Sequence, residues 1–385
     1  MRIPWGTYRT KYLSAFAAGQ GPDLCIWSPN LAPSGIAVPY PNWAVKIMEE
    51  NYCELAKLRC QYEGKWYGPT SGELDAGQML YYNETMIEEA GLSGPPKTLP
   101  EFVEYGKKLT RYGSDGRIER GTWAIRYGGD LFCVFGKFQV FAWAFIDGTK
   151  FGVFNEDYTD IDLDRPEWIE ALKFYKDMVW KWKIASVTMP KPNQAFMLRL
   201  AAMTNREAFL WAAIKEQRPE LLNDIKIAPA MNGAPPYGKY KALASGTRAG
   251  IGEQWWATRD SDYPQVARDA AMWLRGVIEH DLELAKAGAC FPNWKENWET
   301  DYVKNLPYRD AAQVMMNRPI QKQEQAPTEF HDAVWVMLTA VADIITNEDS
   351  DVEATWRDIL EKCRQKIKKY WEGKGRKITF RKLRI

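Results

Sequence analysis

Apolar and polar residues between positions 64 and 110 follow one another in short blocks that predict a series of small elements. Block 66–69 is a short aromatic strand that a Gly-Pro pair stops. A polar stretch follows, and 78–82 is then a compact apolar run with the length of a buried strand. Block 84–90 predicts a short helix that ends at Gly91.

The next helix carries its own start signal. Thr98 and Glu101 have the spacing of a capping box, in which each side chain accepts a hydrogen bond from the other residue's backbone N–H. Phe102, Gly106 and Leu109 then fall on one helical face, which we expect to be buried.

Similar patterns predict elements further along the chain. We expect a strand over 123–127, a buried helix over 132–145, and a long helix over 353–371. Asp262 and Pro264 predict the start of another helix. The apolar stripe expected on that helix consists of Val266, Ala270, Trp273, Leu274 and Val277.

Asp160, Asp162 and Asp164 have the alternating spacing of a calcium-binding loop. That loop needs Gly at its sixth position and a carboxylate at its twelfth, where this chain has Arg165 and Ala171. We therefore expect no metal site here, and we interpret Asp164 as the cap of the helix that follows.

Composition narrows the classes of function. The chain has 385 residues, 46% of them hydrophobic, and a net charge of +1, so the whole molecule has no electrostatic bias toward nucleic acid or membrane. Its 18 Trp residues are unusual. Most belong to a core, but flat aromatic faces also suit an amphipathic ligand such as a sugar. Six Cys without a C-x-x-C pair and only two His argue against zinc. No cofactor is expected.

The C-terminal segment 362–385 is strongly basic. We interpret it as a solvated helix face and a loose tail, while binding to nucleic acid or acidic lipid is the alternative. No run of eighteen apolar residues exists, and Met1 is not followed by a signal peptide.

Catalytic chemistry has little support in the sequence. There is no G-x-S-x-G elbow, and two His make a Ser-His-Asp triad improbable. Glu73 and Asp75 share a face if their segment is extended, about 7 Å apart. They fit hydrogen bonds to sugar hydroxyls, plain solvent exposure or, least well, a glycosidase pair. We expect no enzyme and no catalytic residue.

Five short stretches resemble a known family when taken together. They read Ala-Ala-Gly-x-Gly-Pro-Asp-Leu at 17–24, Gly-Lys-Trp-Tyr-Gly-Pro at 64–69, Leu-Tyr-Tyr-Asn at 80–83, Glu-Ala-Gly-Leu at 89–92, and Pro-Pro-Lys-Thr-x-x-Glu-Phe at 95–102. In this order they are similar to the extracellular solute-binding proteins of ABC sugar importers, the maltodextrin-binding type.

The resemblance implies an α/β fold with two lobes, of the type II periplasmic-binding-protein kind, joined by a hinge of about three crossings. Lobe one is expected at 1–70 and 252–291, and lobe two at 71–251 and 292–385. Compared with the family, lobe one lacks its signal and its first strand and helix. We therefore expect a mis-assigned start or a truncation.

The resemblance also implies where a ligand binds. Residues 27 and 28 would stand at the rim of the cleft, and residues 73 and 75 on the first crossing. Trp255 and Trp256 alternate faces on a strand, so only one of them can point into the cleft. The candidate ligand-binding residues are Trp27, Ser28, Glu73, Asp75, Phe209, Trp211, Trp255 and Trp335.

The implied function is capture of a mono- or oligosaccharide between the lobes and delivery to two permease subunits with their ATPase. We expect a monomer at a periplasmic or extracellular location that binds no nucleic acid and meets the membrane only through the transporter. A carbohydrate-active enzyme, and a degenerate binding protein with a structural or signalling role, are the alternatives. The sequence leaves open the identity of the sugar and the presence of a lipid anchor.

Overall fold

The computed structural model describes residues 8–26, 31–70, 78–128, 131–243, 255–287, 291–320, 326 and 340–385. The chain divides into two compact units. Unit 1 comprises Met1–Leu74, Ala249–Arg309 and Gln323–Asp332, and unit 2 comprises Asp75–Arg248, Asp310–Lys322 and Ala333–Ile385. Each unit is described separately below. The lobe boundaries given above stay a prediction.

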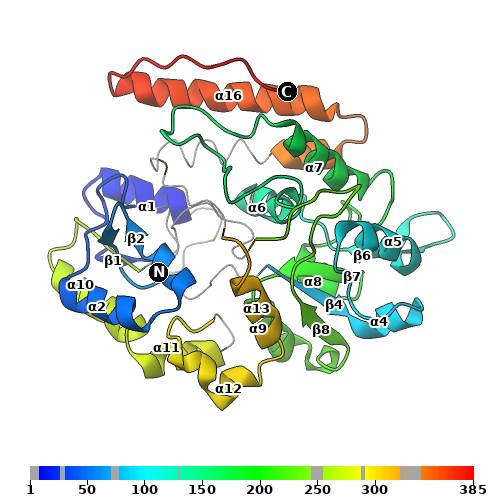
Figure 1. Ribbon diagram of the computed structural model, residues 1–385, viewed down its shortest axis with the longest axis horizontal. Helices are drawn as coiled ribbons and strands as arrows, with labels where there is room; N and C mark the ends of the chain where they lie inside the picture. The colour runs from blue at the N-terminus through cyan, green and yellow to red at the C-terminus, as the bar shows by residue number, and fades with distance from the viewer. Residues whose placement is uncertain are drawn as a thin grey trace. The chain divides into compact units, whose positions relative to one another are not determined.

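Unit 2 is built on a mixed sheet, whose described strands run in the order β5-β6-β7-β4-β8 (Figure 1). Strand β4 pairs antiparallel with both β7 and β8, whereas β6 and β7 are parallel. Every residue of β4 is buried, which confirms the strand expected from its compact apolar run. The strands are β4 (Met79–Asn83), β5 (Arg111–Tyr112), β6 (Ile118–Trp123), β7 (Ala201–Arg206) and β8 (Ile225–Ala228).

The helices of unit 2 confirm the local signals at 84–110. Helix α5 begins with the expected capping box of Thr98 and Glu101, and Phe102, Gly106 and Leu109 are buried. The helices are α4 (Glu84–Glu89), α5 (Leu99–Leu109), α6 (Leu131–Ala142), α7 (Pro166–Asp177), α8 (Pro192–Met197), α9 (Phe209–Gln217), α13 (Arg309–Met316), α15 (Val341–Thr346), α16 (Val352–Gly373) and the 3-10 helix η2 (Pro219–Leu221).

Aromatic rings from α6 and α7 form much of the core of unit 2. Phe138 lies 5.8 Å from Trp168 and 5.5 Å from Tyr175, measured between ring centroids. All three side chains are fully buried. Burial of rings at these separations, with their planes tilted by 47° and 60°, contributes apolar area and aromatic contacts.

The strand expected at 123–127 was placed too late. Strand β6 covers Ile118–Trp123, and the next residues lie beyond its end in irregular conformation. Gly121 pairs with Ala201 and Trp123 with Met203, so the ladder with β7 fixes this register. Arg126 therefore follows the strand rather than lying within it.

The aspartates of the rejected calcium motif bind arginines instead. Asp164 does not cap α7, because the N-cap residue is Arg165 and no side chain caps that helix. The Asp164 carboxylate accepts hydrogen bonds from the guanidinium groups of Arg381 and Arg384. The expected cap was wrong because these distant arginines hold the carboxylate.

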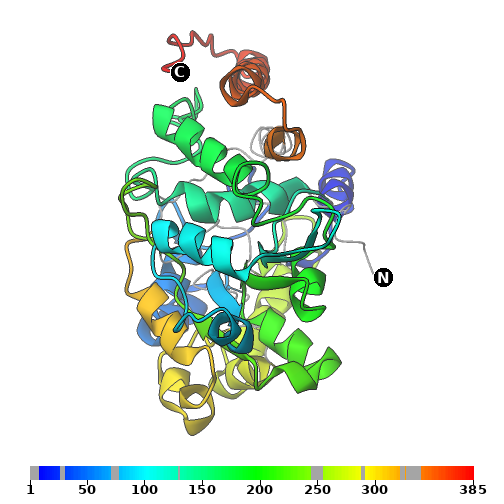
Figure 2. The same ribbon diagram turned by 90° about the vertical axis from the view of Figure 1, so that its right-hand side faces the viewer.

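The basic C-terminal tail is docked rather than loose. Figure 1 shows it turning back along α16, and Figure 2 shows helix and tail, in orange and red, on the outer side of α7. Ile378 and Leu383 are buried. Arg364 of α16, only 2% exposed, binds the Asp160 carboxylate through two hydrogen bonds of 2.8 Å. The expectation of a loose tail is therefore wrong for residues 374–385.

In the described part of unit 1 each strand has two residues, and helices make up most of the regular structure. Strand β1 (Leu24–Cys25) pairs antiparallel with β9 (Trp256–Ala257), and β2 (Gln61–Tyr62) with β3 (Lys65–Trp66). Fully buried Trp256 packs in the core with Tyr67. The helices are α1 (Tyr8–Ala17), α2 (Asn42–Asn51), α3 (Glu54–Arg59), α10 (Pro264–Arg275), α11 (Ile278–Lys286), α12 (Asp301–Lys304) and the 3-10 helix η3 (Glu296–Glu299).

Helix α10 begins at the expected residue but buries the opposite face. Val266 and Trp273 are 63% and 61% exposed, so the predicted stripe is wrong. The buried residues are Ala267, Ala271, Met272 and Arg275. Among these residues, Arg275 has a buried carboxylate as its partner.

Arg275 and Asp281 form an ion pair inside unit 1, with both side chains fully buried and 3.2 Å between Nη1 and Oδ1. Asp281 also accepts hydrogen bonds from the backbone N–H groups of Asn293 and Trp294 and from the Asn297 amide. Burial raises the pKa of Asp281 even though Arg275 and these donors favour its ionised form.

The carbonyl of Thr70 is held from two later parts of the chain. Arg275 Nε donates to it at 3.2 Å and Asn293 Nδ2 at 3.0 Å.

Among all the described helices, none combines the length and the apolar character needed to cross a membrane.

Candidate functional site

Five of the candidate ligand-binding residues lie outside the described part of the chain: Trp27, Ser28, Glu73, Asp75 and Trp335. Three are described, and they lie in both units. Phe209 and Trp211 belong to α9 of unit 2, and Trp255 precedes β9 of unit 1.

The Phe209 ring already has a partner. The Arg206 guanidinium lies over its face, 4.6 Å from the ring centroid. Trp211 is half-buried. A cation on one face of the ring leaves only the other face for stacking on a sugar. Of the two α9 aromatics, Trp211 is therefore the better candidate.

The backbone of Trp255 is fixed within unit 1. Its N–H donates to the Pro69 carbonyl at 2.9 Å, and its carbonyl accepts from the Tyr40 hydroxyl at 2.7 Å. A side chain at Gly68 would come within 2.6 Å of the same carbonyl oxygen. This close packing leaves room only for glycine at position 68, whose φ is +111°. Trp256 is fully buried in the core, so of these two residues Trp255, whose side chain is half-buried, stays the predicted ligand-binding residue.

A second group of residues, most of them polar, lies where the parallel strands β6 and β7 end. In open α/β sheets, ligands bind in the crevice outside the carboxyl ends of such strands. Arg126 and Tyr127 follow β6, and Glu207 follows β7. Lys191 and Pro192, at the start of α8, complete the group.

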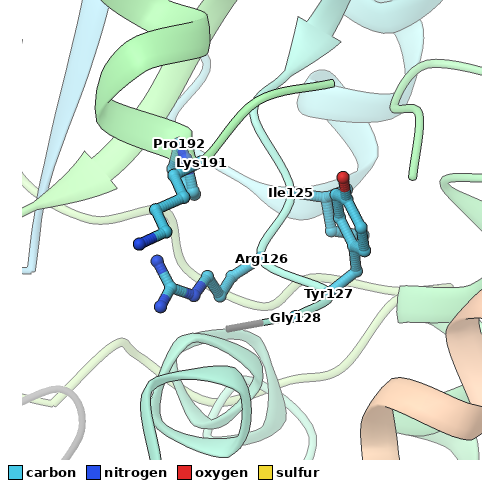
Figure 3. A pocket seen from close by; sticks show the side chains of 6 residues that line it. All are labelled: Ile125, Arg126, Tyr127, Gly128, Lys191 and Pro192. Atoms are coloured by element: carbon cyan, nitrogen blue, oxygen red, sulfur yellow. The ribbon is translucent and has the colours of Figure 1, made fainter. Parts of the chain in front are cut away.

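Four of these residues, together with Ile125 and Gly128, line a cavity of about 210 Å³. Figure 3 shows the Lys191 ammonium and the Arg126 guanidinium converging on one side of it, while the Tyr127 ring lies on the other. The Tyr127 hydroxyl donates to the Met189 carbonyl at 2.7 Å, which fixes the ring. The described lining residues are Ile125, Arg126, Tyr127, Gly128, Lys191 and Pro192, none of them a carboxylate.

A smaller cavity adjoins the first, because Arg126 and Pro192 line both. Asn205, at the end of β7, also lines it and is only 3% exposed. Neither atom of its side-chain amide has a hydrogen-bond partner among the described residues, and the same holds for Arg126 Nε. Buried polar groups are nearly always paired in native proteins. These groups are thus available to a bound molecule.

Glu207 is compensated within its own network. Its carboxylate accepts from Gln78 and, at 3.0 Å, from the Lys137 ammonium. Burial alone would raise the pKa of Glu207, but the charges of Arg206 and Lys137 and the hydrogen bonds lower it to about 2. Glu207 therefore stays ionised and balances Lys137 and Arg206 rather than Arg126 and Lys191.

We predict that Glu207→Gln removes a pH-dependent part of the stability. A carboxyl group with a lowered folded-state pKa stabilises above its unfolded-state pKa, and this contribution fades as pH falls toward 2. Urea unfolding should show the variant about 1–3 kcal/mol less stable at pH 6, with the gap narrowing at pH 3. Glu216→Gln, at an exposed position of α9, is the control and should change neither value. A gap that is constant with pH would contradict the assignment.

Sequence reasoning missed the cavity for two reasons. The strand was expected to reach residue 127, which assigned Arg126 to the sheet rather than to its edge. Lys191 is a lone lysine before a proline, and no local pattern connects it to Arg126. The rule that ligands bind outside the carboxyl ends of parallel strands, applied to the observed end of β6, would have found Arg126 but not Lys191.

Among the described residues no group of His, Cys, Asp and Glu could hold a metal ion.

Comparison with known proteins gives a consistent result. Residues 2–292 match the family model described as bacterial extracellular solute-binding protein. The maltotriose-binding protein of Pyrococcus abyssi is 27% identical over 174 residues, which is 44% of this chain and 33% of that protein. A putative binding protein of Brucella abortus is 25% identical over 237 residues, 59% of this chain and 54% of that protein. The alignments thus span a third to about half of these relatives.

Solved structures share the fold. The maltose/maltodextrin-binding domain MalE of Bdellovibrio bacteriovorus, bound to maltotriose, is similar with a TM-score of 0.71 and 20% identity, covering 95% of this chain and 89% of that one. The sugar-binding protein MalE of Xanthomonas citri gives 0.73 and 17%, covering 98% and 91%. The expected two-lobed α/β fold is confirmed. Since the family model covers more than half of the sequence, the chain belongs to the bacterial extracellular solute-binding proteins.

Proposed function

We propose that this protein binds a mono- or oligosaccharide outside the cytoplasmic membrane and delivers it to the permease of an ABC importer. The family is an extracellular one. The relative from Pyrococcus abyssi is a maltotriose-binding protein, and the solved structure from Bdellovibrio bacteriovorus holds maltotriose. Closure of the two lobes on the sugar, and docking of the closed form on the permease, are part of the proposal.

One observation supports binding of a small polar ligand above all others. The carboxyl edge of the unit 2 sheet has a cavity with unused hydrogen-bonding groups at Arg126 and Asn205 and an aromatic ring at Tyr127. A mainly apolar site with a few polar groups is typical of small-molecule binding. At about 210 Å³ the cavity is smaller than the roughly 300–1,000 Å³ of a whole ligand pocket, so it suits one part of a larger ligand.

Incubation with oligosaccharides separates a carrier from an enzyme. The folded protein should bind a sugar stoichiometrically in calorimetry, and chromatography after long incubation should recover the sugar intact. Turnover would instead support a carbohydrate-active enzyme. Silence across a broad panel of neutral and acidic sugars would contradict sugar binding and favour a structural or signalling role.

We predict that Trp255→Ala weakens sugar binding by about 1–3 kcal/mol, because a stacked ring buries a large apolar area. Titration calorimetry with the sugar found in that panel measures the effect. Trp273→Ala is the matched control, since Trp273 is an exposed Trp of the same unit on α10 and should leave the affinity unchanged. Equal affinity of the Trp255 variant and the natural protein would remove Trp255 from the site.

A further inference from the structure

The cavity at the end of β6 differs from three other cationic sites of unit 2, each of which has a carboxylate partner. Arg364 has Asp160, Arg165 has Asp162, and Lys137 has Glu207 as a carboxylate partner. Arg126 and Lys191 converge on the same cavity, and the described residues that line it include no carboxylate (Figure 3). Two like charges that face one space repel each other and raise its positive potential.

The hydrogen-bonding groups that line this cavity also favour an anionic ligand. Arg126 presents a fixed fork of donors, and its Nε is buried without an acceptor among the described residues. Asn205 adds an unused amide from a side chain that is 97% buried, in the cavity that Arg126 also lines. A cationic fork beside a second cation is suited to an oxyanion, which accepts several charge-assisted hydrogen bonds.

The nearby carboxylate of Glu207 is not the counter-ion of Arg126 and Lys191. Glu207 is directed to Lys137 and Gln78, at hydrogen-bond distance from both. Lys191 is exposed, so it reaches solvent and can meet an incoming ligand, whereas Arg126 is half-buried and held at the strand end. The apolar walls at Ile125 and Pro192 lower the local dielectric, which strengthens the attraction of both charges for an anion.

We propose that the sugar ligand carries an oxyanion, either a uronate carboxylate or a sulfate or phosphate ester, which Arg126 and Lys191 bind. This inference rests on the proposed function and narrows it to acidic saccharides. Arg126 supplies the directional hydrogen bonds, and Lys191 supplies a point charge at the mouth of the cavity. Asn205 and the Tyr127 ring then contact the neutral part of the same sugar residue.

The test compares matched acidic and neutral ligands by titration calorimetry. The panel contains oligogalacturonates with their methyl esters, a sulfated chondroitin disaccharide with its unsulfated form, glucose 6-phosphate with glucose, and maltotriose. We expect one acidic member to bind at least about 10-fold more tightly than its neutral counterpart. Which acidic member binds distinguishes a carboxylate from a sulfate or phosphate ester.

Substitutions test whether Arg126 and Lys191 bind the anionic group of the ligand. Arg126→Gln should weaken binding of the acidic ligand by roughly 10- to 100-fold, and Lys191→Gln should weaken it less, because a hydrogen bond to a charged group is worth more than a distant charge. Lys108→Gln removes an exposed charge from α5 of the same unit and is the control for net charge. Circular dichroism checks that each variant is folded.

The outcomes separate the two proposals. Binding of a neutral sugar with no preference for an acidic one overturns the anion inference and leaves sugar binding intact. The same follows if an acidic sugar binds but Arg126→Gln and Lys191→Gln keep its affinity. No binding by any member of the panel to the folded protein overturns sugar binding itself, and the anion inference with it.

Discussion

Asp281→Ala is expected to destabilise the protein by about 3–5 kcal/mol. The substitution leaves the Arg275 guanidinium buried without its carboxylate, and removal of one partner from a buried ion pair has a cost of this size. It also removes the acceptor of the Asn293 and Trp294 backbone N–H groups, which are held 3.0 and 3.1 Å from the carboxylate. Urea unfolding followed by Trp fluorescence measures the loss.

Two further variants make this prediction specific. Asp269→Ala removes an exposed carboxylate from the same helix as Arg275 and should change stability by less than about 0.5 kcal/mol. The double replacement Arg275→Met with Asp281→Leu removes both charges, so it should be less damaging than Asp281→Ala alone. An Asp281→Ala variant that unfolds at the natural urea midpoint would show that the pair contributes nothing.

The second large effect is expected at the other end of the chain, where Arg364→Ala should cost about 3–5 kcal/mol. Arg364 and Asp160 form a buried bidentate pair, and the truncation removes both of these hydrogen bonds, so that the Asp160 carboxylate keeps the Ile161 backbone N–H, 2.8 Å away, as a donor. The Arg364 guanidinium also lies 5.1 Å from the Phe380 ring centroid, so the tail loses part of its contact with α16.

Arg376→Ala is the matched control for Arg364→Ala. Arg376 binds Asp157 at 3.0 Å, but the two side chains are 47% and 54% exposed, and exposed pairs contribute less than about 1 kcal/mol. Both arginines belong to the same basic segment, so burial is the main difference between them. Equal losses in the two variants would contradict the distinction. Protease sensitivity of the tail should increase in Arg364→Ala.

Local signals in the sequence were sufficient for the elements near β4. The capping box of Thr98 and Glu101 and the compact run at β4 depend on residues a few positions apart, and both were found. The motifs in the same segment also identified the family and its fold class. Such signals carry over to the structure because capping and strand burial are decided largely by neighbours in the chain.

Features that depend on distant partners were not predictable. The wrong face of α10 was predicted because Val266 and Trp273 are apolar, whereas the structure exposes both and buries Arg275 beside Asp281 of the next helix. The docked tail depends on Asp164 meeting Arg381 and Arg384 across more than 200 positions of sequence. No periodic pattern contains this information.

The candidate ligand-binding residues stay a prediction. The structure places Trp256 in the core, which leaves Trp255 as the candidate of the two. The convergence of Arg126 with Lys191, which are 65 positions apart, requires the tertiary structure. Five candidate residues lie outside the described part of the chain and stay a prediction.

The pairing of β1 with β9 has a consequence for synthesis on the ribosome. Cys25 must wait for Trp256, its partner in the ladder, and at 5–20 residues per second that interval lasts on the order of 10–50 s. The strands described for the unit 2 sheet are all synthesised within that interval, between Met79 and Ala228. The early segment of unit 1 is therefore synthesised long before its partner strand, and it stays without that partner until after the described strands of the second sheet have been made.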